Sequence, residues 1–75
     1  MLVIIACTDS QESLILSDRV IASKGKLGVF LADNWDASPT VADCVARFLE
    51  CESAEEVREK VEAGVYTILP ELTIL

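Results

Sequence analysis

The cysteines at positions 7, 44 and 51 are the first candidates for chemistry, because a thiolate is both a nucleophile and a metal ligand. Cys7 is followed by Thr8 and Asp9, but the sequence offers no neighbouring cation or helix N-terminus that would activate the thiol. Histidine, the usual general base and the commonest metal ligand, is absent. We therefore expect no catalytic residue, no metal site and no cofactor, and we expect the cysteines to pack in the core.

The stretch from Asp33 to Asp36 combines three oxygen-bearing side chains with the single tryptophan of the sequence. It lacks the spacing, the glycine and the distal glutamate of a calcium loop, so a turn that leads into a helix is the simpler expectation. Trp35 would then either pin this loop to the core or serve as an anchor for a partner, since tryptophan is enriched at binding hot spots. Both roles stay open, as does a minor enzymatic or metal-binding alternative built on Cys7 with Asp9 or on this loop.

A series of glutamates between positions 50 and 62 is the strongest charge feature. It is either a solvated helix face, partly neutralised by Arg58 and Lys60, or a surface that recognises a basic groove on another protein. Under the second hypothesis the partner-binding residues are Trp35, Asp36, Glu52, Glu55, Glu56, Glu59 and Glu62.

Charge is unevenly distributed along the 75 residues, whose net charge is −7. Residues 1–33 hold four acids and three bases, whereas residues 34–75 hold nine acids and three bases. Direct binding to nucleic acid or to anionic membranes is therefore not expected, because both depend on lysine and arginine. A protein with a basic surface is the natural partner.

The first 32 residues predict a meander of three or four strands. Residues 2–7 are an unbroken apolar run, typical of a strand covered on both faces, and residues 13–17 and 20–23 follow with a turn or bulge at Ser17-Asp18-Arg19. Lys24-Gly25-Lys26 predicts a hairpin tip in which Gly25 takes a positive φ. Residues 27–32 then alternate between two faces.

Two helices should follow. Ser38 and Pro39 are a cap and a first-turn proline, and an apolar stripe runs to about residue 50 through Val41, Cys44, Val45, Phe48 and Leu49. Ser53-Ala54-Glu55-Glu56 matches a capping box, so a second, shallow helix should begin at Ala54 and end before Gly64. Residues 65–69 favour a strand, which Pro70 ends or confines to an edge.

The chain is rich in apolar residues for its size, at 52%, which suggests that some apolar surface serves association. Leu72, Ile74 and Leu75 are the expected oligomer contacts, with the edge strand as another route, and self-association as a homodimer or larger homo-oligomer is expected. An odd number of cysteines favours a reducing compartment, and no apolar run approaches the roughly 18 residues of a membrane span. We expect a cytoplasmic protein.

The sequence thus predicts one α+β domain over residues 1–75, with a small antiparallel sheet made of the N-terminal meander and a C-terminal strand, and two helices on one face. The function we favour is a non-enzymatic modulator, an inhibitor or adaptor that binds a protein. A bacteriophage-type inhibitor of a nucleic-acid-handling or defence complex would suit these traits. The alternative is a homo-oligomerising structural domain or an accessory subunit of a larger complex.

Overall fold

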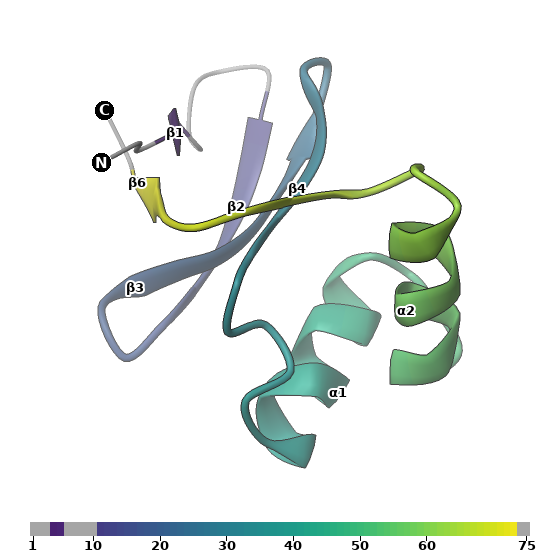
Figure 1. Ribbon diagram of the computed structural model, residues 1–75. Coiled ribbons are helices and arrows are strands. Elements are labelled where there is room, and N and C mark those ends of the chain that lie inside the picture. The colour runs from purple at the N-terminus through teal and green to yellow at the C-terminus, as the bar shows by residue number, and fades with distance from the viewer. Residues whose placement is uncertain (1–3, 6–10, 74–75) are drawn as a thin grey trace.

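The computed structural model describes residues 4–5 and 11–73, and confirms a small α+β domain with two helices (Figure 1). Its strands and helices, in chain order, are β1 (Ile4–Ile5), β2 (Gln11–Leu16), β3 (Arg19–Gly25), β4 (Gly28–Ala32), α1 (Pro39–Phe48), α2 (Ala54–Glu62), β5 (Thr67–Leu69) and β6 (Leu72–Thr73).

The main sheet has the order β2-β3-β4-β5 and is mixed. The expected meander is present, because β2, β3 and β4 pair antiparallel. The C-terminal strand also joins the sheet, but β5 runs parallel to β4, with Leu31 opposite Ile68, rather than antiparallel as expected. The physical reason is the connection: α1 and α2 together form a crossover long enough to carry the chain back to the end of the sheet where β4 begins.

A second, two-stranded sheet joins the two described ends of the chain. β1 pairs in parallel with β6, with Ile4 opposite Leu72, instead of extending the meander next to β2. The segment around β6 thereby lies across the main sheet on the side away from the helices (Figure 1).

Two short turns set the register of the meander. Ser17 and Asp18, with φ of 51° and 63°, form the expected turn between β2 and β3, and positive φ at both central residues matches the right-handed twist of a hairpin. The next turn lies one position later than expected, because Gly25 pairs with Gly28 around Lys26 and Leu27. Gly28, not Gly25, takes the positive φ, of 115°.

Strand β4 is covered on both faces. Leu31 is fully buried in the larger core cluster, which also contains Val45 of α1 and Val57 of α2. The neighbouring Ala32 packs instead with Val20 and Leu72 in a smaller cluster. The helices therefore cover one face of the strand and β6 covers the other, an arrangement that requires the nearly continuous apolar sequence of β4.

Both helices begin at a serine, as predicted, but the two caps differ. The Ser38 hydroxyl accepts a hydrogen bond from the Val41 amide at 3.2 Å, in the standard N-cap arrangement. The Ser53 side chain makes no capping bond to α2. Glu56 supplies the other half of the expected capping box, but with a different donor. Its carboxylate accepts a hydrogen bond from the Glu52 amide, at 3.0 Å, instead of from the amide of the next residue, Ser53.

Both helices end in the same Schellman motif, which satisfies two carbonyls of the last turn. After α2, Gly64 has the positive φ of 82°, and the Val65 amide donates to the Lys60 carbonyl at 2.9 Å. The Tyr66 amide also points to that carbonyl, at 3.3 Å, so β5 starts at Thr67 and not at the expected residue 65. After α1, the left-handed position is held by Glu50, with φ of 59°, which ends the helix at Phe48.

We expect Glu50→Gly to stabilise the protein by about 1 kcal/mol, because a side chain in the left-handed region carries a steric cost that glycine avoids. Glu50→Ala is the control, since it removes the carboxylate without relieving the backbone. Gly64→Ala should destabilise the protein by a similar amount, because it places a side chain in the left-handed region. A Cβ at this position would meet no atom within 4 Å, so the change in stability would report the backbone cost alone. Urea unfolding of the three variants measures this. Equal stability for Glu50→Gly and Glu50→Ala would contradict the argument.

Candidate protein-binding surface

Helix α2 separates its apolar and acidic residues by helical spacing. Val57 is fully buried against the sheet and α1. Glu55, Glu59 and Glu62 are exposed and recur at intervals of four and three residues, which places them on one face of a helix. The prediction that α2 carries an exposed row of carboxylates is confirmed for these three residues.

The loop between β4 and α1 lies beside this row. Its Asp36 carboxylate is 3.6 Å from the Arg58 guanidinium, which also pairs with Glu55 at 3.1 Å. The loop itself is a series of turns, held by bonds from the Trp35 amide to the Ala32 carbonyl and from the Ala37 amide to the Asn34 carbonyl, both 3.1 Å long. Two segments more than 20 residues apart in sequence are thus joined at one surface.

A groove of about 300 Å³ runs between the loop and α2. Carboxylates stand around it, and one tryptophan and two aliphatic side chains form its apolar part; the lining residues are Asp33, Trp35, Asp36, Arg58, Val61, Glu62 and Ile68. We call the carboxylates at this groove and along α2 the acidic face, made up of Asp33, Asp36, Glu55, Glu59 and Glu62.

Trp35 is only 5% exposed and belongs to the larger core cluster. Of the two roles expected for it, the structure shows the one in which it pins the loop to the core. The ring still contributes to the groove, where the Arg58 guanidinium lies 5.6 Å from the ring centroid. A partner would therefore meet Trp35 as part of a preformed surface, not as a projecting anchor.

Glu52 and Glu56, two of the predicted binding residues, lie apart from the acidic face. The Glu56 carboxylate accepts from the Glu52 amide and pairs with Lys60 at 3.4 Å, and Lys60 in turn lies 5.8 Å from the Tyr66 ring. The Glu52 amide, followed by Lys60, holds the pKa of Glu56 below its ordinary value, despite some opposing desolvation. Glu56 thus holds the start of α2, and Glu52 supplies the backbone donor for it.

Of the two described cysteines, Cys51 packs beside the core, as expected. Cys44 and Cys51 are free thiols and half-buried, and Cys51 packs against the larger cluster. The Cys51 sulfur is 3.5 Å from the Tyr66 hydroxyl, and burial, followed by this contact, raises the pKa of Tyr66 to about 12. Cys7 lies outside the described residues.

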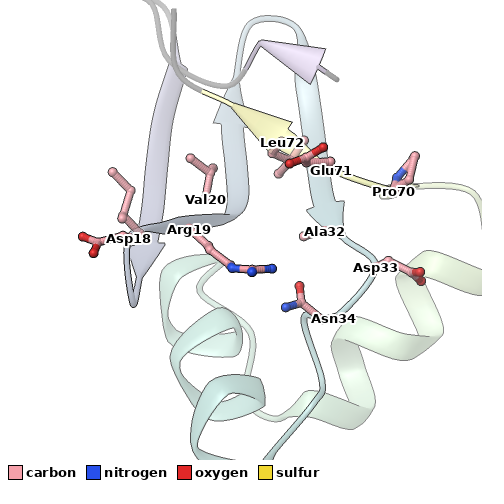
Figure 2. A pocket seen from close by; sticks show the side chains of 10 residues that line it. Asp18, Arg19, Val20, Ala32, Asp33, Asn34, Pro70, Glu71 and Leu72 are labelled. Carbon is pink, nitrogen blue, oxygen red and sulfur yellow. The ribbon is translucent and has the colours of Figure 1, made fainter. Parts of the chain in front are cut away.

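A larger pocket, of about 830 Å³, opens at the opposite end of β4 from its hairpin with β3 (Figure 2). The Arg19 side chain extends into it, toward Asn34 of the loop. Three carboxylates, of Asp18, Asp33 and Glu71, also line it, so its charge is mixed. The sequence carried no signal for this pocket, because four separate segments of the chain form it.

Leu72, expected at an oligomer interface, is instead buried in its own chain against Val20 and Ala32. The physical reason is that β6 pairs with β1 and covers the second face of the sheet. Ile74 and Leu75, the other two residues of that prediction, lie outside the described residues.

Within the described part of the chain, no three histidine, cysteine or acidic side chains are placed to hold a metal ion. Nor does that part contain a helix long and apolar enough to cross a membrane. No protein-family model, no curated protein and no solved structure matches this chain.

Proposed function

We propose that this chain is a non-enzymatic protein-binding modulator, an inhibitor or adaptor, and that its acidic face docks on a basic surface of another protein. The observation that carries this proposal is the convergence of the Asp33–Asp36 loop and α2, which brings five of the thirteen acidic side chains to the groove and the exposed face of α2. Charge complementarity of this kind speeds association and selects partners.

Two carboxylates of α2, those of Glu59 and Glu62, are available to a partner. Arg58 already engages Asp36 and Glu55. Within residues 11–72, neither Glu59 nor Glu62 forms an ion pair, and both are exposed. A partner's lysines and arginines would find these two carboxylates solvated and unpaired, and their pairing would be sensitive to salt.

A protein that handles nucleic acid is one class of partner that offers such a surface, because its groove is already lined with cations. The acidic face, docked on such a partner, would block the partner's nucleic-acid-binding groove. The free thiols of Cys44 and Cys51 support action in a reducing compartment, for which we propose the cytoplasm.

We expect the double substitution Glu59→Lys, Glu62→Lys to weaken partner binding by at least 10-fold without unfolding the protein. Rim charge pairs act through attraction that this change converts to repulsion, and both side chains are exposed. The measurement is quantitative affinity capture from the source cells with wild-type and variant baits, read by mass spectrometry and repeated at raised ionic strength.

The matched control is Asp43→Lys, Glu71→Lys, which changes the net charge equally at exposed positions outside α2. Proteins retained by this control and lost with the first variant and with salt would support the proposal. Equal capture by both variants would overturn it. The alternative function is self-association through β2, an outer strand of the main sheet on which Ile15 is half exposed. An oligomer in sedimentation that neither double variant disrupts would point to it.

A further inference from the structure

Three groups from two segments surround the Arg58 side chain. Its two terminal nitrogens lie 3.6 Å from an Asp36 oxygen and 3.1 Å from a Glu55 oxygen. Its central carbon lies 5.6 Å from the centroid of the Trp35 ring. A cation over the face of tryptophan and between carboxylates is a complete recognition arrangement for a guanidinium, here filled by the chain's own arginine.

The groove extends beyond Arg58. Asp33 and Glu62 line it as well, and Val61 and Ile68 supply apolar contact for a side-chain stem. The groove therefore contains two carboxylates, those of Asp33 and Glu62, that Arg58 does not engage. Its volume of about 300 Å³ is at the lower end of the range for ligand pockets, which suits one side chain rather than a free cofactor.

Arg58 is held loosely enough to be exchanged. Its side chain is 45% exposed, and those of Asp36 and Glu55 are 39% and 80% exposed. Ion pairs between exposed groups contribute roughly 0–1 kcal/mol, because water and salt screen them. Another cation can therefore compete with Arg58 at small cost.

We propose that the groove is a guanidinium-binding site which Arg58 occupies in the free protein, and that an arginine side chain of the basic partner displaces Arg58 from Trp35 and Asp36. This inference rests on the proposed function and specifies its partner as one that inserts arginine, not lysine. A planar guanidinium can stack on the ring and pair with a carboxylate at once, whereas an ammonium is a compact, strongly hydrated point charge.

Lys60 provides an internal control for this idea. It lies on the same helix, pairs with Glu56 at 3.4 Å and lies 5.8 Å from the Tyr66 ring. Removing Lys60 therefore makes the same change in net charge and also uncovers an aromatic ring and a carboxylate, but it leaves the groove at Trp35 filled.

The test is titration of wild-type protein, Arg58→Ala and Lys60→Ala with acetylated, amidated tetra-arginine and tetra-lysine peptides. Calorimetry gives affinities, and the fluorescence of the single tryptophan reports occupancy of the groove. We expect Arg58→Ala to bind tetra-arginine roughly 5- to 10-fold more tightly than wild type, from the lost competition of one exposed ion pair and one cation–π contact. Lys60→Ala should gain about 2-fold or less, and tetra-lysine should gain little with either variant. Arg58→Met, which keeps an apolar stem over Trp35, replaces Arg58→Ala if the alanine variant is destabilised.

Equal gains for Arg58→Ala and Lys60→Ala would overturn the inference, since net charge alone would explain them. Equal gains for the two peptides, or no change in tryptophan fluorescence, would overturn it as well. The proposed function fails separately. If the Glu59→Lys, Glu62→Lys variant loses partner capture but Arg58→Ala shows no arginine-specific gain, the proposed function stands and the guanidinium site is overturned. If capture is unchanged but Arg58→Ala shows the arginine-specific gain, the guanidinium site stands and the proposed function is overturned.

Discussion

Replacing Trp35 with alanine should lower the free energy of unfolding by about 3–5 kcal/mol, the range for losing a buried tryptophan from a core. The side chain is 5% exposed and packs in the cluster that joins both helices to the sheet. A domain of 75 residues has a total stability of only about 4–11 kcal/mol, so the variant should be largely unfolded or strongly destabilised at 37 °C. Circular dichroism during thermal and urea unfolding measures this, because the substitution removes the fluorescent residue.

Two further substitutions separate burial from side-chain size. Trp35→Phe keeps a ring in the core and should recover much of the loss. Leu27→Ala removes a large apolar side chain that is 60% exposed at the hairpin tip, and should change stability by less than about 0.5 kcal/mol. A loss below about 1 kcal/mol for Trp35→Ala would contradict the core placement, and would return this residue to the role of an interface anchor.

Gln11→Met should destabilise the protein by about 2 kcal/mol, because it removes hydrogen bonds while nearly conserving side-chain volume. The Gln11 amide nitrogen donates to the Ser23 hydroxyl at 2.8 Å and contacts the Gly28 carbonyl at 3.5 Å, and its carbonyl oxygen accepts from the Leu27 amide at 2.8 Å. One buried side chain on β2 thus joins β3 to the tip that leads into β4. A melting temperature lower by roughly 10 °C is expected for a domain of this size.

The neighbouring Glu12 serves as the control. It is exposed, and its ion pair with Lys24 is 3.7 Å long, so Glu12→Met should change stability by less than about 0.5 kcal/mol. If Gln11→Met and Glu12→Met unfold at the same urea concentration, the three bonds of Gln11 do not stabilise the hairpin.

Local signals in the sequence predicted most elements of the fold. Ser38 with Pro39 marked the start of α1, Gly64 marked the end of α2, and helical spacing placed the exposed glutamates on one face. These features depend on interactions within about one helical turn, which a sequence displays directly.

Long-range pairing could not be predicted in the same way. The direction of β5 depends on how the two helices pack, and the pairing of β1 with β6 joins opposite ends of the described chain. The helix end at Glu50 was missed because a glutamate there lacks the usual glycine signal. For the candidate site, the acidic row of α2 was predictable, whereas the contact of Asp36 with Arg58, 22 positions apart, was not.

The parallel pairing of β5 with β4 also orders events in time. Strands β2, β3 and β4 can form by successive local hairpins, but β5 cannot reach its place until the chain through α1 and α2 has closed a loop of more than 30 residues. The acidic face spans that closure, since one half follows β4 and the other lies on α2. The acidic face therefore cannot assemble before that loop has closed, which makes it a later feature of folding than the meander.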